Sequence, residues 1–234
     1  MDSKTLFIIP ARGGSKGIPY KNIKNFVGKP LIVYSIDLAR KFVADKDICV
    51  STDDQKIIDV VESYGLKVPF IRSKELATDT ASTNDVLLHA LMHYKNKENI
   101  YYERIVLLQP TSPLREEQHI REALDLYSKE ADMIVSVCRT DVSSVLCKDN
   151  EEGFIEPIFN KHQSRRQDIE PFYVYNGAIY VINVKSLINK GIQSFEKKIK
   201  YVMPQEKSID IDTPLDWIIA ECLFNEDKKR VSNQ

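Results

Sequence analysis

The chain has 234 residues with 33 Lys and Arg against 34 Asp and Glu, so the formal net charge is -1 and nothing indicates a general nucleic-acid or membrane binder. Hydrophobic residues make up 43%, enough for one large core or for a domain with an appended arm. No apolar run approaches the roughly 20 residues of a membrane span, and no signal peptide is evident. The four cysteines lack CxxC spacing. We therefore expect a soluble, cytoplasmic protein with free thiols.

Strand-like and helix-like patterns alternate along residues 1–139. Strands are predicted at 6–9, 47–52, 67–72, 105–109 and 132–138, and helices at 31–43, 55–64, 84–95 and 116–129. Short connections between such elements predict a mostly parallel, doubly wound sheet with helices on both faces. Ligands bind such sheets at the carboxyl ends of the strands. The segments after Ile9, Ser51, Gln109 and Cys138 should therefore gather on one side.

The segment 140–175 departs from this pattern, because it is rich in polar residues and contains Gly153, Pro157 and Pro171. It predicts a hairpin-bearing arm outside the main sheet. Strands are predicted again at 176–182 and 199–203, followed by a capped helix over 213–223. The predicted organisation is thus an α/β domain formed by 1–139 and 176–225, an inserted arm at 140–175, and a frayed, charged tail at 226–234.

The loop after the first strand predicts a phosphate site. It contains three glycines, and its polar residues are Arg12, Ser15, Lys16, Lys21 and Asn22. Glycines let the main chain approach a ligand closely, and backbone N–H groups with cations suit a polyphosphate. The spacing fits neither the Walker A loop nor the dinucleotide fingerprint. A basic surface turn is the alternative, although an ordinary turn needs no cluster of cations.

Two carboxylates near the C-terminus predict a metal site. Asp210 and Asp212 are two residues apart, so in a strand they would face the same side and could bind Mg²⁺. The alternative is that Asp212 caps the following helix, since Asp-Thr-Pro is typical of a helix start. Both can hold, with Asp210 the better metal candidate.

Two further polar segments are candidates for substrate recognition. The first, Gln109-Pro110-Thr111-Ser112-Pro113-Leu114-Arg115, places a glutamine at a strand end before a rigid loop. The second contains Arg165 and Arg166, which could hold a carboxylate or phosphate but could equally be a solvated charge run. His89 and His93 have a zinc-compatible spacing without a third ligand, so ordinary histidines are favoured there.

Taken together, five motifs resemble the N-acylneuraminate cytidylyltransferases, the CMP-sialic acid synthetases. They are Pro10-Ala11-Arg12-Gly13-Gly14-Ser15-Lys16-Gly17-Ile18, Lys21-Asn22, Leu108 to Arg115, Asn176-Gly177-Ala178-Ile179-Tyr180 and Ser208-Ile209-Asp210-Ile211-Asp212-Thr213. The motifs keep the family's order and span most of the chain. The resemblance implies a Rossmann-like, nucleotidyltransferase fold of the type found in nucleotide-sugar transferases. It also implies a homodimer whose arm reaches the partner's active site.

The implied reaction is attack of a nonulosonic acid hydroxyl on the α-phosphate of CTP, with Mg²⁺ required and pyrophosphate released. By resemblance, the nucleotide contacts are Ala11, Arg12, Gly13, Ser15, Lys16, Lys21, Asn22 and Ser82, and the metal ligands are Asp210 and Asp212. The implied sugar contacts are Gln109, Arg165, Arg166, Tyr180 and Phe195. The residues expected to act in catalysis are Arg12, Lys16, Lys21, Gln109 and Asp210.

The sequence departs from the sialic acid enzymes in one stretch. Their sugar pocket has an aromatic pair before the Asp-x-Asp motif, where this chain has Gly191-Ile192-Gln193-Ser194-Phe195 with a single aromatic. The sugar therefore stays open among sialic, deaminated sialic, legionaminic and pseudaminic acids. No histidine is placed as a general base, so metal-assisted deprotonation is the hypothesis. The alternatives are an octulosonate-type cytidylyltransferase and a non-catalytic nucleotide-sugar binding module.

Overall fold

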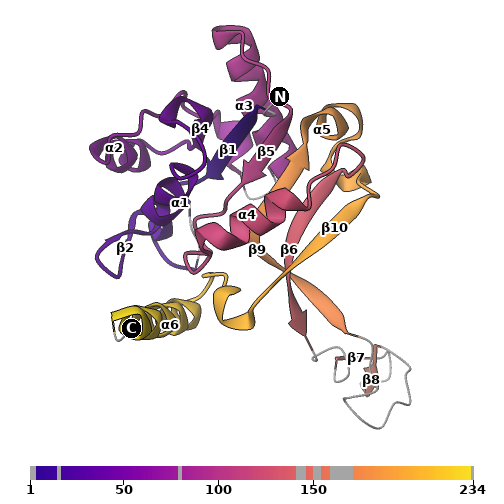
Figure 1. Cartoon of the computed structure of the whole chain (residues 1–234). Coiled ribbons are helices and arrows are strands. Elements are labelled where there is room, and N and C mark those ends of the chain that lie inside the picture. Colours follow the sequence, from indigo (N-terminus) through magenta and orange to yellow (C-terminus); the bar gives the residue numbers. More distant parts are fainter. Residues whose placement is uncertain are drawn as a thin grey trace.

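The computed structural model describes residues 4–14, 17–78, 81–140, 146–149, 154–158 and 171–232. A six-stranded sheet with strand order β10-β6-β9-β5-β1-β4 forms its centre (Figure 1). Its strands are β1 (Thr5–Pro10), β4 (Ile48–Ser51), β5 (Arg104–Leu107), β6 (Met133–Thr140), β9 (Phe172–Asn183) and β10 (Lys198–Met203). Only β9 runs antiparallel, between β5 and β6. The predicted mostly parallel sheet is therefore confirmed, as a mixed sheet.

Helices cover both faces of this sheet (Figure 1). One face packs against α1 (Leu31–Ala39), α2 (Gln55–Ser63) and α4 (Glu117–Asp125), and the other against α3 (Thr83–Glu98) and α5 (Val184–Lys190). Strand β1 shows why: Phe7 and Ile9 belong to the first core cluster, whereas Leu6 and Ile8 belong to the second. A strand buried on both faces is uniformly apolar, as this one is.

The order of the strands places the loop after β1 at the point where the chain changes from one side of β1 to the other. The chain passes from β1 through α1 to β4 on one side, and later returns to β5 on the other side of β1. The loop after β1 therefore lies where the direction of winding reverses, which is where open α/β sheets bind ligands. Since β1, β4 and β5 are parallel, their carboxyl ends share one edge of the sheet.

The structure differs from the predicted secondary structure in three places. Residues 67–72 form no strand but a single bridge between Thr52 and Ile71, and Pro69 lacks the donor that a longer ladder would need. The charged tail is not frayed up to residue 232, because α6 (Pro214–Ser232) continues through it. Helix α5 was not predicted; its N-cap, Asn183, accepts a hydrogen bond from Ser186 N.

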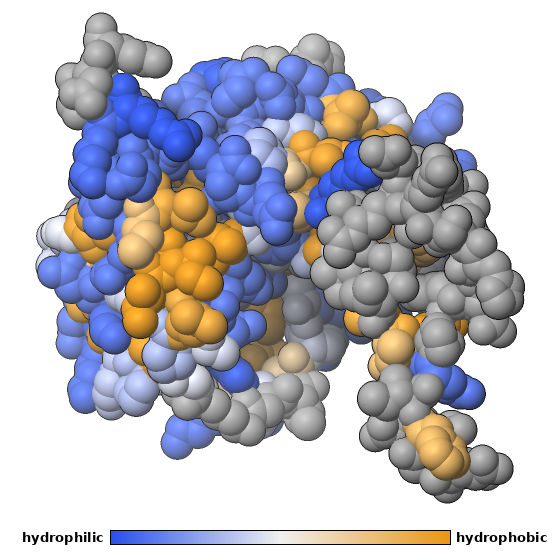
Figure 2. All heavy atoms as spheres, turned by 90° about the horizontal axis from the view of Figure 1, so that it is seen from below, coloured by the Kyte–Doolittle hydropathy of each residue, from blue (hydrophilic) through white to orange (hydrophobic). Residues whose placement is uncertain are grey.

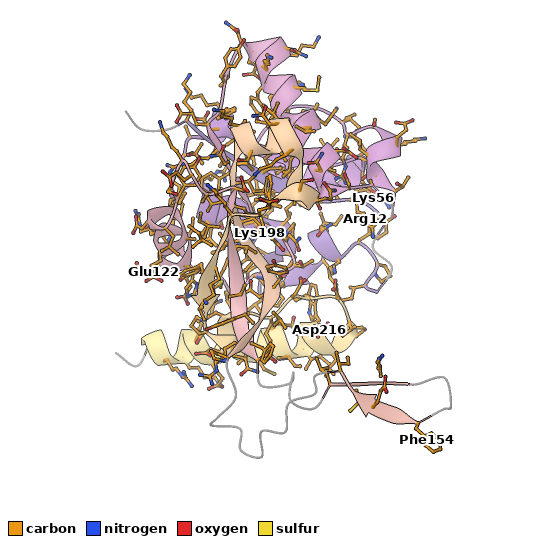
Figure 3. All side chains as sticks on the ribbon, turned by 90° about the vertical axis from the view of Figure 1, so that its right-hand side faces the viewer. Arg12, Lys56, Glu122, Phe154, Lys198 and Asp216 are labelled. Carbon is orange, nitrogen blue, oxygen red and sulfur yellow. The ribbon has the colours of Figure 1, made fainter. Side chains whose placement is uncertain are left out.

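The predicted arm contains a separate two-stranded antiparallel hairpin formed by β7 (Cys147–Asp149) and β8 (Ile155–Pro157). Phe154 projects from this hairpin, away from the main sheet, and is 66% exposed (Figure 3). The sheet extends further than expected, since residues 172–175 pair with β6 as part of β9.

The shorter elements lie in the connections. They are η1 (Lys21–Ile23), β2 (Asn25–Phe26), β3 (Lys29–Pro30), η2 (Asp45–Asp47), η3 (Lys74–Ala77), η6 (Ile192–Ser194) and η7 (Gln205–Lys207). A search of the described residues finds no helix that combines the length and the apolarity needed to cross a membrane. All four cysteines are free thiols.

Candidate active site

A cleft of about 620 Å³ opens at the carboxyl ends of β1 and β5. Its size lies in the usual range for small-molecule sites. Its lining comes from four stretches of the chain and comprises Pro10, Arg12, Gly17, Lys21, Asn22, Arg72, Leu76, Thr78, Ala81, Thr83, Val86, Leu87, Leu107, Gln109, Pro110, Thr111, Asp210 and Asp212. The structure therefore brings together the loop after β1, the loop after β5 and the two predicted metal ligands.

The loop after β1 is held by its own backbone and by the neighbouring strand end. Asn22 Nδ2 donates to the carbonyl oxygen of Arg12 at 3.1 Å, and Gly13 N donates to Asp53 Oδ1 at 3.3 Å. A Cβ atom at Gly13 would lie 2.3 Å from Asp54 Oδ2, so a larger residue there would displace the side chain of Asp54, which caps α2. Ser15 and Lys16 lie outside the described residues, and their phosphate contacts stay predictions.

Lys21 joins this loop to the C-terminal carboxylates. It is 8% exposed, and its Nζ donates to the carbonyl oxygen of Ile211 and to Asp212 Oδ1, the latter at 2.9 Å. A Cβ atom at Gly17 would lie 2.2 Å from the backbone oxygen of Asp212. Segments that are 190 residues apart in sequence thus form one wall of the cleft.

Asp210 and Asp212 lie in a loop between η7 and α6, so the expectation that residues two apart in a strand face the same side does not apply to them. Ile211 between them is fully buried, and its N–H donates to the carbonyl oxygen of Thr111 at 2.8 Å. The helix start is made by Thr213, whose N–H donates to Asp216 Oδ2 at 2.7 Å while its Oγ1 accepts from Asp216 N. The alternative role of the Asp212 side chain as the helix cap is therefore wrong.

The environment of Asp210 suits a hard cation. Burial raises its pKa, a hydrogen bond from the Thr111 side chain lowers it, and the nearby charge of Asp212 raises it again. Its Oδ1 is buried and has no hydrogen-bond partner among the described residues. Two adjacent carboxylates with an unpartnered oxygen fit Mg²⁺, which keeps water and substrate phosphates as its other ligands. The described residues form no cluster of three metal-ligating side chains.

Gln109 and Asp210 converge on Gly177 of β9. This glycine has φ of +71°, and a Cβ atom placed on it would lie 3.1 Å from both Gln109 Oε1 and Asp210 Oδ2. The next-door Asn176 is buried; its Oδ1 accepts from Ser136 Oγ at 2.6 Å, and its Nδ2 donates to Ser208 Oγ at 2.9 Å. Asn176 therefore maintains the irregularity in β9 that brings Gly177 to the cleft.

Another part of the cleft lining is more apolar and contains one cation that the sequence analysis missed. Leu76, Val86 and Leu87 line it together with Arg72, which is 5% exposed. Burial lowers the pKa of Arg72, while Asp53 raises it through charge and through a hydrogen bond from Arg72 Nη2. Arg72 escaped notice because its segment was predicted to be a strand without a functional signal.

The remaining residues that were predicted to contact the nucleotide or the sugar lie at different places relative to the cleft. Ser82 is the N-cap of α3 and accepts from Asp85 N at 3.1 Å, while its neighbours line the cleft. Tyr180 is half-buried against the second core cluster, and its pKa is raised by burial and by the charge of Asp210. Phe195 is 4% exposed within that cluster and does not line the cleft. Arg165 and Arg166 lie outside the described residues.

Three of the four histidines lie in described segments, and none of these lines the cleft. His89 and His93 pack against the ring of Phe70, with centroid distances of 4.7 and 4.8 Å. His119 Nδ1 accepts from Glu116 N at the start of α4. Their positions are accounted for by packing and helix capping.

A cationic glycine loop at the switch point of the sheet, beside paired carboxylates, defines a nucleotide-binding α/β protein. The family model described as "Cytidylyltransferase" matches residues 6–233, and the chain belongs to this family.

Individual relatives agree with the family match. The chain is 35% identical to a CMP-N,N'-diacetyllegionaminic acid synthase of Legionella pneumophila, over 94% of this chain and 96% of that protein. It is 37% identical to an N-acylneuraminate cytidylyltransferase of Streptococcus agalactiae, over 92% of this chain, but it spans only 52% of that longer protein. A solved CMP-2-keto-3-deoxy-manno-octonic acid synthetase complexed with CTP aligns with a TM-score of 0.72 at 18% identity, covering 96% of this chain and all of that one, and this likeness shows the shared fold.

Proposed function

We propose that the protein transfers CMP from CTP to a hydroxyl of a nonulosonic acid and releases pyrophosphate. The observation that carries the proposal is the cleft whose lining combines Arg12 and Lys21 with Asp210 and Asp212. The hydroxyl oxygen bonds to the α-phosphorus, the bond from that phosphorus to the pyrophosphate breaks, and the hydroxyl proton is released. The cations would offset the triphosphate charge, and the carboxylates beside Lys21 suit its metal ion.

The lining residues of the cleft support separate roles in binding the phosphates, the base and the sugar. Arg12 and Lys21 lie beside the glycine loop and would bind the phosphates. The apolar side chains of Leu76, Val86 and Leu87 give a flat pyrimidine ring a surface to pack on, with Arg72 available as a buried donor. Gln109 lies next to Asp210 and would meet the sugar near its reacting hydroxyl.

Asp210 and Asp212 would hold Mg²⁺. When bound, the ion would neutralise phosphate charge and lower the pKa of a coordinated hydroxyl. Lys21 already neutralises part of the charge of Asp212, so the buried and unpartnered Oδ1 of Asp210 is the stronger ligand candidate.

We also propose a homodimer. Exposed apolar side chains occur on the hairpin (Leu146, Phe154 and Ile158) and at the base of the arm (Val174 and Tyr175). Helix α6 adds a stripe of exposed Leu215, Ile218 and Ile219, and Figure 2 shows an apolar patch on the side where α6 lies. A second copy of the chain would cover these surfaces in a self-complementary contact. The implied approach of Arg165 and Arg166 to the partner's cleft is part of this proposal.

The decisive experiment follows pyrophosphate release from CTP and Mg²⁺ with a panel of acids. The panel contains sialic, deaminated sialic, legionaminic and pseudaminic acids, with the eight-carbon octulosonate as comparator. We expect release with at least one nonulosonic acid, a matching amount of CMP-sugar, and little release when UTP replaces CTP. Release with the octulosonate alone would favour that alternative, and no release with any acid would favour a binding module.

A further inference from the structure

Arg115 lies directly behind the cleft and is 3% exposed. Its Nη1 donates to the carbonyl oxygens of Gln109 at 2.7 Å and Ala178 at 3.0 Å, and its Nη2 donates to Ser35 Oγ. One guanidinium group therefore connects the loop after β5, the irregular part of β9 and helix α1.

A charge at this position has a cost that packing alone does not explain. Burial lowers the pKa of Arg115 to about 9, even though the negative charge of Asp210 opposes the effect. Its Nε has no hydrogen-bond partner in the described part of the chain. Buried charges are destabilising unless they are well paired, and apolar residues of similar volume often replace them without loss. Because the buried charge of Arg115 does not favour stability, we look for its role in the neighbouring cleft.

The two carbonyl groups that Arg115 holds belong to the backbone that positions the reacting region. Gln109 presents its own side chain to the cleft, and Ala178 follows Gly177 directly. The Cβ position of Gly177 is 3.1 Å from Gln109 Oε1 and 3.1 Å from Asp210 Oδ2. A shift of either backbone segment would change the separation of these two side chains.

We propose that Arg115 is a positioning residue, which clamps the Gln109 and Ala178 carbonyl groups and thereby sets the spacing of the Gln109 and Asp210 side chains across Gly177. The inference rests on the proposed cytidylyl transfer. The planar fork of arginine reaches several acceptors in fixed directions, whereas the ammonium of lysine keeps the charge but cannot span the same acceptors. The proposed role therefore depends on the geometry of the Arg115 guanidinium and not on its charge alone.

The test compares Arg115→Lys with the wild type at a temperature where both are folded. We expect kcat to fall roughly 10- to 100-fold, the size expected for a small misplacement of reacting groups. The KM for the acid sugar should rise more than the KM for CTP, because Gln109 would meet the sugar, whereas Arg12 and the glycine loop keep their positions. A purely structural role predicts a lower melting temperature with unchanged kcat and KM, and that result would overturn the proposal.

Lys190→Met is the matched control. Lys190 Nζ donates to buried Asp132 at 2.9 Å, at the opposite edge of the sheet. This variant should lose thermal stability without change in kcat or either KM. Equal kinetic losses in Arg115→Lys and Lys190→Met would show that destabilisation alone explains the effect, and would refute the clamp.

Gly177→Ala perturbs the Gln109 and Asp210 side chains directly, because the added Cβ atom would lie 3.1 Å from each of them. It should reproduce the kinetic pattern, and the double variant with Arg115→Lys should be no more than about twofold worse than the poorer single variant, because the two changes act on one geometry. Fully additive losses would contradict the clamp. If Arg115→Lys fails to fold, Gly177→Ala carries the test, and unchanged kinetics in it overturn the proposal.

Failure of the proposed cytidylyl transfer can be distinguished from failure of the positioning role, because pyrophosphate release by the wild type is measured first. Should the wild type release none, Mn²⁺ affinity by electron paramagnetic resonance replaces the kinetics. Arg115→Lys, or Gly177→Ala in its place, should then weaken Mn²⁺ binding roughly tenfold through displacement of Asp210, and Lys190→Met should not. Unchanged Mn²⁺ affinity would overturn the positioning role.

Discussion

Individual side chains in the cleft divide into those that would meet substrate and those that hold the others in place. Arg12, Lys21 and Asp210 line the cleft, whereas Asn22 also donates to the Arg12 backbone. Asp210 differs from its neighbour Asp212 in being partly buried with one unpartnered oxygen, while the side chain of Asp212 is 73% exposed and paired with Lys21. The two carboxylates are therefore not equivalent.

We expect Asp210→Asn to lower Mg²⁺-dependent pyrophosphate release by roughly 100-fold or more, since a metal ion contributes several kcal/mol to charge stabilisation. Excess EDTA should abolish the wild-type activity. Mn²⁺ titration by electron paramagnetic resonance should show weaker binding in the variant. The exposed Asp59→Asn on α2 is the control and should behave as the wild type. Near-normal turnover of Asp210→Asn would rule out the metal assignment.

At the scale of elements, the amino end of β6 is secured by a buried carboxylate. Asp132 accepts hydrogen bonds from Lys190 Nζ at 2.9 Å, Ser186 Oγ at 2.7 Å and the backbone N–H groups of Glu196 and Lys197 at 3.1 and 3.0 Å. Burial by itself would raise the pKa of Asp132, but these hydrogen bonds outweigh it and hold the pKa well below its usual range. The network joins β6, α5 and the start of β10.

Asp132→Asn should therefore lower the free energy of unfolding at pH 7 by about 2 kcal/mol, the usual size for hydrogen bonds to a charged group. Because the folded pKa lies below the unfolded value of about 3.9, this stabilisation is present above that pH and is lost as the pH falls below it. Urea unfolding from pH 7 to pH 3 should show the wild type and the variant converging. The exposed Asp125→Asn should show no such trend, and a pH-independent gap for Asp132→Asn would contradict the assignment.

At the scale of the whole molecule, the apolar surfaces of α6 and of the hairpin are the main features that a single chain leaves unexplained. Leu215, Ile218 and Ile219 are 64%, 58% and 38% exposed, while Trp217 and Ala220 on the other side of the helix are buried in the third core cluster. The helix thus has apolar residues on two sides, of which only one packs against its own chain. The proposed dimer would cover the other.

The double variant Leu215→Asp/Ile218→Asp should shift the protein from dimer to monomer in sedimentation velocity at micromolar concentration, because charge in an apolar interface is strongly unfavourable. Met92→Asp is the matched control, since Met92 is 59% exposed on α3, which lies at the far end of the molecule (Figure 1). It should leave the dimer intact. A wild-type protein that sediments only as a monomer would refute the dimer.

The periodic elements and the kinds of chemistry in the site could be predicted from the order of the residues. Alternating strand and helix patterns are local properties, so β1, α2 and α3 were predicted within a few residues. The charge of Arg12, the glycines beside it and the carboxylates of Asp210 and Asp212 are visible in the residue types themselves. Composition, however, says nothing about which segments meet, and resemblance to a family supplied the link between these motifs.

Tertiary structure alone decided how distant segments combine. The contact of Lys21 with Asp212, the reversed direction of β9 and the approach of Gly177 to Gln109 depend on packing across the sheet, and no local pattern encodes them. The same holds for Arg115. Its burial and its hydrogen bonds to the carbonyl oxygens of Gln109 and Ala178 arise only when the chain is folded. Burial and pairing depend on neighbours far along the chain, so they appear only when the chain is folded.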